Sequence, residues 1–449
     1  MMSFRKRLIK VIVMVLVCFF LASIWYWDSS EPNIDWSSSL EVVGSKTKIN
    51  FIIQDEDRGL KSIEVALLQS GKRHIVQSEN YSPTWFWENG ELRRPIDISI
   101  GDFLGAGELL EGEFWLEIIA RDHTNWWLWS REIFERKRFF LDLTPPNIEL
   151  VSTQHYIRQG GSEAISYRVS EDTVVSGVQV GERIFRGTLL PGGRNSLCLF
   201  ALAHDQSIGT DMWLWAEDAV GNRSRINFWK KVFPVRSRSR RISLSTRLIN
   251  KVTTEISGRS NQFSQEKTPL KTFLKINGRL RQINDQAIEN LTQNSASYLL
   301  LNQSFLQLSN SKVESAFADH RHYYYRNEKV DEQTHLGFDL ASVANSPIES
   351  GNDGIVVYAD YLGIYGNCVL VDHGLGLLSL YGHLSQIEVQ TGQSVKRGQI
   401  LGRTGQTGLA GGDHLHFSIF LQGVQVNPLE WWDQRWVEQH ILSKSVATN

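Results

Sequence analysis

The apolar and polar positions of the first thirty residues predict a membrane-spanning helix. Four basic residues within the first ten positions precede an apolar stretch from Val11 to Trp27, which only Ser23 interrupts. A basic flank of this kind orients an apolar helix with the flank in the cytoplasm. The stretch is close to the lower limit of roughly 17 residues for spanning a bilayer. A cleaved signal peptide is the alternative, but no small-x-small cleavage site follows the run. We therefore expect residues 1–30 to form an uncleaved anchor.

Short β-prone runs separated by turn residues fill the chain from the anchor to about residue 234. In the first stretch these runs lie at residues 48–53, 63–68, 114–120 and 139–143. Thr144-Pro145-Pro146 then interrupts any regular element, and the same pattern of short β-prone runs returns beyond it. Runs at this spacing are typical of a two-sheet sandwich. We predict two immunoglobulin-like β-sandwich domains, at 38–144 and 147–234.

A short internal repeat supports the prediction of two similar domains. The segment 120–125 follows Trp115-Leu116, and the segment 216–222 follows Trp213-Leu214 in the same way. Both segments contain Asp and Asn, whose side chains hydrogen-bond to nearby backbone groups in turns. We expect them to shape the turn between two strands, with calcium binding as the alternative.

The pattern of short β-prone runs ends near residue 235. Arginine alternates with serine from Arg236 to Arg241, which predicts a solvated linker; attraction to anionic lipid or to a cell-wall polymer is the alternative. Thr268-Pro269 then suits a helix start, with threonine as N-cap and proline at the first position. Apolar residues recur mostly three and four positions apart up to Leu291, with Gly278 marking a kink or a break. We expect a short helical subdomain at 242–310.

Glycine and β-branched residues return together from residue 311. Short strands joined by glycine turns are expected at residues 354–359, 367–372, 377–381 and 400–402. The run from Leu415 to Leu421 also alternates, which places His414 and His416 on one face of a strand. We predict an antiparallel β domain at 311–437, and a chain that is mainly β overall.

Composition narrows the class of protein. At 449 residues, with 41% hydrophobic and 21% charged residues, the chain is globular and too long for one core. The formal net charge of -2 gives no basic field of the kind that nucleic-acid binding needs. Three cysteines occur, none in a Cys-x-x-Cys pair, which supports neither a zinc knuckle nor a disulfide framework.

Histidines and one carboxylate in the C-terminal region carry the chemistry. His335 and Asp339 stand four positions apart, His383 lies between them and the His414-x-His416 pair. A catalytic zinc takes three protein ligands from His, Asp or Glu and keeps a fourth position for water. Three of these five residues can therefore hold the metal and leave two histidines for proton transfer. Each histidine alone would be an ordinary core or surface side chain.

A further run, His320-Arg321-His322, has no carboxylate at metal-ligand spacing. We assign it to the lining of a substrate groove or to structure.

The motifs His335-x-x-x-Asp339, Tyr381-Gly382-His383-Leu384 and His414-x-His416, in this order, resemble the lysostaphin-type (LytM-like) zinc metallo-endopeptidases. The resemblance implies a compact antiparallel β fold with a groove across the zinc. It implies that His335, Asp339 and His416 bind one Zn²⁺ per domain, and that His383 and His414 form the catalytic pair beside it. The reaction implied is hydrolysis of a peptide bond in peptidoglycan, in cross-links or stem peptides.

The expected mechanism assigns different tasks to the two unligated histidines. One acts as general base on a water molecule, since imidazole titrates near neutral pH. Its protonated partner stabilises the oxyanion, and Tyr325 is a candidate further donor.

Two other functions remain open at this stage. The first is an envelope scaffold that activates another cell-wall hydrolase, its partner; residues 242–310 would then control the site by packing over the groove. The second is a peptidase acting on protein substrates. In the leading hypothesis the protein crosses the inner (cytoplasmic) membrane once, and the bulk of the chain lies in the periplasm against peptidoglycan.

Overall fold

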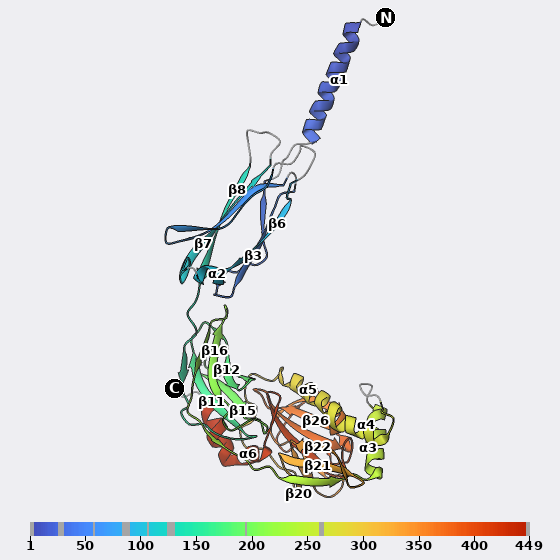
Figure 1. The fold of residues 1–449 in the computed structure, drawn as a ribbon. Helices are drawn as coiled ribbons and strands as arrows, with labels where there is room; N and C mark the ends of the chain where they lie inside the picture. Colours follow the sequence, from blue (N-terminus) through green and yellow to red (C-terminus); the bar gives the residue numbers. More distant parts are fainter. Residues whose placement is uncertain are drawn as a thin grey trace. The chain divides into compact units, whose positions relative to one another are not determined.

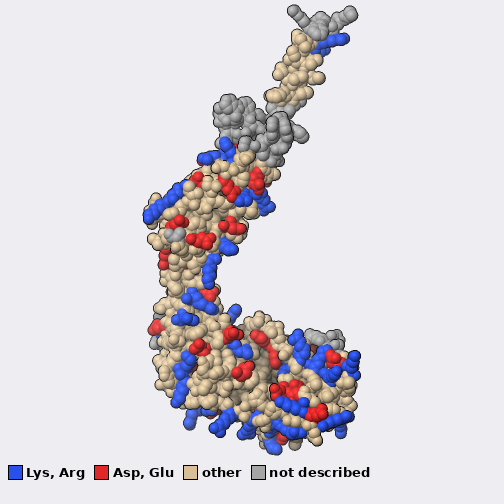
Figure 2. Space-filling model, in the orientation of Figure 1, with Lys and Arg blue, Asp and Glu red and all other residues tan. Residues whose placement is uncertain are grey.

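The computed structural model is mainly β with few helices (Figure 1). It describes residues 4–25, 31–56, 59–82, 90–105, 107–123, 131–193, 195–259 and 265–445. The chain forms two compact units, residues 1–145 with 218–222 and residues 146–217 with 223–449. On the face seen in Figure 2, cationic and anionic side chains are interspersed and no stripe of one sign stands out.

Helix α1 spans Phe4–Trp25. Among the described residues, no helix combines the length and the apolar character that crossing a membrane requires. Residues 26–30 of the expected anchor, and the side chains of residues 21–25, lie outside the described part of the chain. The anchor stays a prediction.

The first unit contains two β-sheets on one core. The smaller sheet has the order β1 (Asn33–Trp36), β3 (Lys48–Gln54), β6 (Arg93–Ser99). The larger sheet has the order β2 (Val42–Val43), β8 (Glu132–Leu141), β7 (Gly112–Asp122), β4 (Leu60–Gln69), β5 (Lys72–Asn80). A short helix, α2 (Ile100–Gly105), follows β6. Alternate residues of β3 and β7, such as Phe51 and Leu116, point into the shared core, as the period of two in a strand requires.

The second sandwich opens the second unit. One sheet has the order β14 (Thr188–Leu189), β15 (Ser196–Ala201), β11 (Ser162–Val169), β9 (Ile148–Leu150). The facing sheet has the order β13 (Arg183–Arg186), β12 (Thr173–Val180), β16 (Met212–Asp218), β17 (Arg223–Ile226). Strands β10 (Tyr156–Arg158) and β18 (Lys231–Phe233) pair in parallel beside them. The immunoglobulin-like class of both sandwiches stays a prediction.

The turn expected after β16 is built as predicted. One carboxylate oxygen of Asp218, Oδ1, accepts hydrogen bonds from the backbone N–H groups of Val220 and Asn222, both at 2.9 Å. The corresponding turn after β7 falls on residues 124–130, outside the described part of the chain.

The segment predicted as a solvated linker is partly a strand. β19 (Ser239–Ser243) pairs in parallel with β21 (Asp319–Tyr325), and β21 pairs with β22 (Glu328–His335). An ion pair explains the ordering, because Arg240 Nε lies 3.3 Å from the buried carboxylate of Asp319. The local sequence predicted a solvated run because the acidic partner, Asp319, lies far along the chain.

Helices α3 (Thr246–Arg259), α4 (Pro269–Lys275) and α5 (Arg281–Thr292) follow. Thr268 caps α4 as predicted, since its side-chain oxygen accepts from Lys271 N. At Gly278 the chain does not break but passes through a π-helical turn, η1 (Ile276–Leu280).

These helices share a hydrophobic core with the C-terminal β domain (Figure 1). Phe273 and Leu280 from the helical segment join Tyr365, Leu380 and Phe420 in one cluster of buried residues. The helices therefore stabilise the sheet that carries the histidines.

The C-terminal domain is built on an antiparallel sheet, as predicted. Its order is β20 (Lys312–Ser315), β23 (Phe338–Ala341), β31 (Leu415–Leu421), β27 (Leu377–Leu384), β26 (Asn367–Asp372), β25 (Gly354–Tyr361), β29 (Ser394–Val395), with β32 (Val424–Val426) on β31. A smaller sheet has the order β24 (Pro347–Glu349), β30 (Ile400–Arg403), β28 (Gln386–Ile387). A 3₁₀ turn, η2 (Gly363–Tyr365), precedes β26, and the chain closes with α6 (Pro428–Trp432), α7 (Gln434–Trp436), η3 (Val437–Leu442) and α8 (Ser443–Ser445).

Helix α6 joins this domain to the second sandwich through a buried carboxyl group. Glu430 accepts hydrogen bonds from the backbone N–H of Ser162 at 2.9 Å and from its hydroxyl at 3.4 Å. Burial raises the pKa of Glu430 to about 8, because an ionised carboxylate loses its hydration there.

The pH dependence of the free energy of unfolding should reveal the titration of Glu430. The unfolded chain releases the Glu430 proton near the ordinary pKa of about 4.3, whereas the folded chain keeps it until about pH 8. Stability therefore falls as pH rises through this window, by at most about 5 kcal/mol at roughly 1.4 kcal/mol per pKa unit. Glu430→Gln should flatten this decline in denaturant unfolding at pH 5 and pH 8.5. Glu438→Gln, at an exposed position nearby, is the control; an equal slope in Glu430→Gln and wild type would contradict the assignment.

Candidate metal centre

Three strands from two sheets position the candidate metal ligands. His335 ends β22, Asp339 lies in β23, and His416 lies in β31. Asp339 and His416 are direct cross-strand partners, and Gly382 of β27 pairs with His416 from the other side. The three residues between His335 and Asp339 form the turn that leads from β22 into β23. A one-residue shift in the pairing of β23 with β31 would turn these side chains to the opposite face.

Three ligand atoms converge on one point. His335 Nε2 lies 3.0 Å from Asp339 Oδ1 and 3.1 Å from His416 Nδ1, and the last two atoms are 2.9 Å apart. A tetrahedral zinc ion with bonds of about 2.0–2.1 Å separates its ligand atoms by roughly 3.3 Å. Slight expansion of this triangle would fit the ion. The group is recognisable as a site that could hold a metal.

Hydrogen bonds to the other ring nitrogens fix the lone pairs that face this point. His335 Nδ1 lies 3.0 Å from the carbonyl oxygen of Ala316, which can only accept, so the proton sits on Nδ1 and Nε2 is bare. The Ser418 hydroxyl donates to Leu336 O at 2.8 Å and lies 2.9 Å from His416 Nε2. Its proton is thus engaged, so His416 Nε2–H donates and Nδ1 is bare. Such outer partners are typical of metal-binding histidines.

A glycine makes room for this arrangement. A Cβ added to Gly337 would lie 2.6 Å from His416 Cε1 and 2.5 Å from Ser418 Oγ. Real Cβ atoms do not approach so closely, so Gly337 is required where the turn passes His416.

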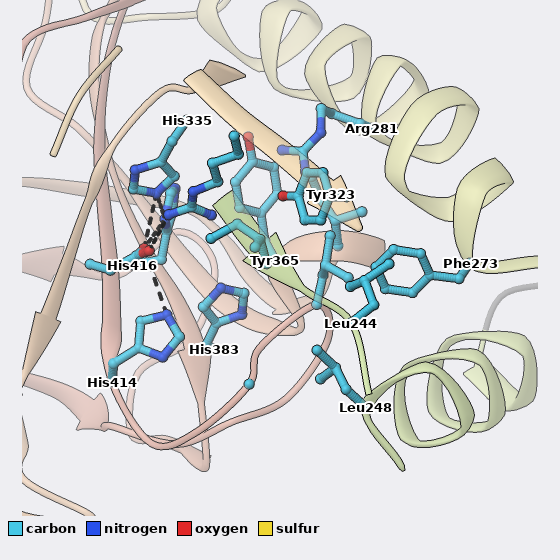
Figure 3. A pocket seen from close by; sticks show the side chains of 16 residues that line it. Leu244, Leu248, Phe273, Arg281, Tyr323, His335, Tyr365, His383, His414 and His416 are labelled. Atoms are coloured by element: carbon cyan, nitrogen blue, oxygen red, sulfur yellow. Dashed lines mark hydrogen bonds and ion pairs between the residues drawn. The ribbon is translucent and has the colours of Figure 1, made fainter. Parts of the chain in front are cut away.

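His383 and His414 flank the three candidate ligands (Figure 3). Their ring centroids are 4.9 Å apart, and the ring of His383 lies 5.7 Å from that of His416. Each donates its Nδ1 proton to a backbone carbonyl, of Thr407 at 2.8 Å and of Gly412 at 2.9 Å. Both rings therefore keep Nε2 for the site, and His414 Nε2 lies 3.6 Å from Asp339 Oδ1.

The backbone of His383 is strained. Its φ of +68° is in the left-handed region, which residues other than glycine rarely adopt. Such strain costs on the order of 1–3 kcal/mol and is found at functional sites. The hydrogen bond from Nδ1 to Thr407 O holds the ring in this orientation.

Burial and charge set the protonation states. Burial opposes ionisation of Asp339, but its contacts with the rings of His335, His414 and His416 outweigh burial and hold its pKa well below the usual value. Burial, with His414 and His416 beside it, lowers the pKa of His383 well below its usual range. Burial also lowers the pKa of His416 to about 4. Burial also opposes the charged form of His414, but the nearby carboxylate of Asp339 outweighs burial and raises the pKa of His414. At neutral pH Asp339 is therefore ionised and His383 is neutral.

A pocket of about 190 Å³ opens beside the five residues. Its far wall is apolar and comes largely from the helical segment and the residues before it, with Leu244, Leu248 and Phe273 among the lining side chains (Figure 3). Tyr323 and Tyr365 also line it. Tyr325 is not among the lining side chains, and its hydroxyl lies 3.4 Å from Thr246 Oγ1, so the geometry gives no support to its expected role as an oxyanion donor.

Arg321 lines the pocket, as expected for a run assigned to groove lining or structure. Its ion pair with Asp339, at 2.6 Å, falls outside the sequence-based expectation. Helix α3 contacts the loop that precedes His414, since Lys251 Nζ donates to Gln406 O at 2.6 Å and Gly408 N donates to the Glu255 carboxylate at 2.7 Å. Residues 242–310 thus border the groove.

The comparisons with known proteins fall on this part of the chain. Residues 333–428 match the model of peptidase family M23. The DD-carboxypeptidase/endopeptidase Mpg of Neisseria meningitidis serogroup B is 36% identical over 95 residues, which are 21% of this chain and 22% of that protein. The peptidoglycan DD-endopeptidase ShyA of Vibrio cholerae is 38% identical over 96 residues, again 21% and 22% of the two chains. The catalytic domain of lysostaphin from Staphylococcus simulans is 27% identical, with a TM-score of 0.25, and covers 29% of this chain and 98% of that one.

The match to the two curated relatives thus spans little more than a fifth of their length. The family match at residues 333–428 contains all five residues of the candidate site and leaves the sandwiches, helices α3, α4 and α5, and Arg321 outside. The resemblance to lysostaphin-type enzymes is confirmed at the level of this domain. At its C-terminal end, the chain carries a metallopeptidase domain of family M23.

Proposed function

We propose that the protein is a zinc-dependent endopeptidase that hydrolyses peptide bonds of peptidoglycan, in cross-links or stem peptides. The observation that carries the proposal is the convergence of three bare ligand atoms within 3.1 Å of one another, with two further imidazoles beside them. The name of the relative ShyA, a peptidoglycan DD-endopeptidase, supports the substrate class.

His335, Asp339 and His416 would hold the zinc ion, whose charge lowers the pKa of a bound water to about 7 and polarises the scissile carbonyl. The neutral ring of His383 offers a bare Nε2 that can accept a proton as general base. The ring of His414, whose pKa is raised, can in its protonated form donate Nε2–H to the developing oxyanion. The apolar far wall of the pocket excludes water from one side of the substrate and thereby strengthens these contacts.

The proposal places the domain outside the cytoplasmic membrane. The N-terminal segment 1–30 would anchor the chain in the inner membrane, and the two sandwiches would serve as spacers or wall-binding modules in the periplasm. Retention of the full chain in membranes washed with alkaline carbonate is the expected result. Its release into the wash would contradict the anchor and leave the chemistry of the site untouched.

The decisive experiment combines metal content with substrate choice. The purified full chain is expected to hold one zinc ion and to release soluble muropeptides from purified sacculi, while leaving denatured protein uncut. Cleavage of denatured protein alone would favour a peptidase of protein substrates. A chain that binds zinc yet cuts neither would favour a scaffold that activates another cell-wall hydrolase, and stimulation of amidases would then be measured.

A further inference from the structure

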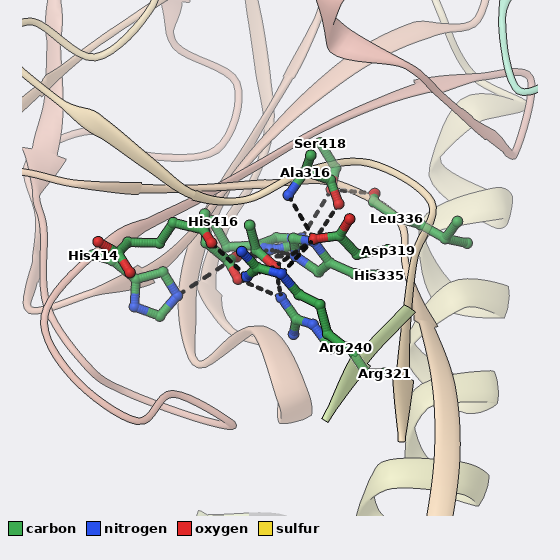
Figure 4. Close-up of polar contacts among 12 residues, drawn as sticks. Arg240, Ala316, Asp319, Arg321, His335, Leu336, His414, His416 and Ser418 are labelled. Carbon is green, nitrogen blue, oxygen red and sulfur yellow. Dashed lines mark hydrogen bonds and ion pairs between the residues drawn. The ribbon is translucent and has the colours of Figure 1, made fainter. Parts of the chain in front are cut away.

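The arginine of the His320-Arg321-His322 run reaches the metal centre from outside the family match. Arg321 Nη2 donates to Asp339 Oδ2 at 2.6 Å and to Ser315 Oγ at 2.8 Å (Figure 4). The other carboxylate oxygen, Oδ1, faces His335 and His416. The two oxygens of Asp339 therefore have separate partners: Oδ2 pairs with the arginine and Oδ1 points to the site.

The segment that presents Arg321 also holds a second ligand. In the turn before β21, Asp319 Oδ2 accepts from Ala316 N at 3.1 Å and from Ser315 Oγ at 3.2 Å. The carbonyl of Ala316 in turn accepts the Nδ1 proton of His335. One short piece of chain, residues 315–321, thus contacts two of the three candidate ligands. It lies wholly before residue 333, where the family match begins.

Strand geometry explains why the arginine, and not its neighbours, faces the site. Successive side chains of a strand point to opposite faces, so His320 and His322 face away when Arg321 faces Asp339. The side chains of Arg321 and Asp339 are 20% and 13% exposed. An ion pair this sheltered is costly to break from one side, because the remaining charge is left without a partner.

We propose that Arg321 is a positioning residue for the metal ligand Asp339. It binds Oδ2 and so presents Oδ1 alone to the ion. The inference rests on the metal site of the proposed function, but not on its substrate. Two effects oppose each other. The positive charge of Arg321 repels a cation, whereas its hydrogen bond pre-orients the carboxylate. Loss of an outer partner of a metal ligand typically weakens metal binding 10- to 100-fold, so the orientation effect is expected to dominate.

The test compares Arg321→Gln, Arg321→Lys and Arg240→Gln in the full chain, with zinc affinity measured by competition against a chromophoric chelator. Arg321→Gln should bind zinc about 10- to 100-fold more weakly than wild type. Arg321→Lys keeps the charge but loses the forked geometry of the guanidinium. Its zinc affinity should lie between those of Arg321→Gln and wild type. Arg240→Gln is the matched control. Its arginine belongs to the same cluster and is 43% exposed, but it pairs with Asp319 and not with Asp339; the zinc affinity of this variant should fall by less than about 10-fold.

A spectroscopic readout separates orientation from a loss of fold. With Co²⁺ in place of zinc, the visible absorption of Arg321→Gln and Arg321→Lys should differ from that of wild type, since the carboxylate binds differently; Arg240→Gln should match wild type. Zinc affinity and Co²⁺ spectrum both unchanged in the Arg321 variants would overturn the inference, as would tighter zinc binding. Should Arg321→Gln fail to fold, Arg321→Lys carries the same test. A wild type that is inactive on sacculi, with weaker zinc in Arg321→Gln, would refute the proposed function and uphold the inference.

Discussion

Replacement of His416 with alanine is expected to abolish zinc binding and, with it, all peptidase activity. His416 Nδ1 lies within 3.1 Å of both other ligand atoms, so its loss leaves two ligands where a catalytic zinc needs three. The loss in affinity should far exceed the 10- to 100-fold that removal of an outer partner costs. Metal content after dialysis, and release of soluble muropeptides from sacculi, are the two measurements.

A fold-preserving control belongs beside this variant. His416 is buried in β31, and its alanine variant also loses the hydrogen bond to Ser418. Circular dichroism and the unfolding midpoint therefore have to accompany the metal assay. His320→Ala changes an exposed histidine on the neighbouring hairpin and should keep metal and activity. A folded His416→Ala protein with one zinc ion per chain would contradict the assignment of His416 as a ligand.

The sequence was most informative where chemistry requires residues close together in the chain. The run Leu415–Leu421 predicted a strand, and β31 has these bounds. The spacing of His335 and Asp339, and of His414 and His416, predicted that these residues would act together, and the structure brings all of them to one point. Their division into ligands and catalytic pair stays a prediction, supported by the ring nitrogens that the hydrogen bonds leave bare.

Relationships between distant segments could not be read in this way. The parallel pairing of β19 with β21 joins residues some eighty positions apart, and neither segment shows the pairing by itself. Arg321 pairs with Asp339 across a hairpin, so that no local spacing identifies it as part of the site. The helical periodicity of residues 268–291 was visible, but nothing in it revealed that Phe273 and Tyr365 share a core. Local patterns fix which face of an element is apolar, whereas its partner depends on the whole fold.

Replacement of His383 or His414 with alanine is expected to leave zinc bound and to lower kcat by about 10²- to 10⁴-fold, the range typical of a lost general acid or base. Neither ring is among the three converging ligands, and His414 Nε2 is 3.6 Å from Asp339 Oδ1. Removal of either ring therefore leaves the ligand triangle intact. The measurements are zinc affinity and kcat on a defined cross-linked muropeptide.

The double variant decides whether the two histidines act as a unit. The rings are 4.9 Å apart, and each keeps its Nε2 for the site through a backbone hydrogen bond on Nδ1. When two residues serve one transition state, the losses in rate from removing each are not additive. Removal of the second residue then lowers kcat little further than removal of the first. We expect His383→Ala/His414→Ala to be about as slow as the slower single variant, with zinc still bound. Fully additive losses would mean that the two rings act in separate steps. Loss of zinc in His414→Ala would make His414 a ligand and remove it from the catalytic pair.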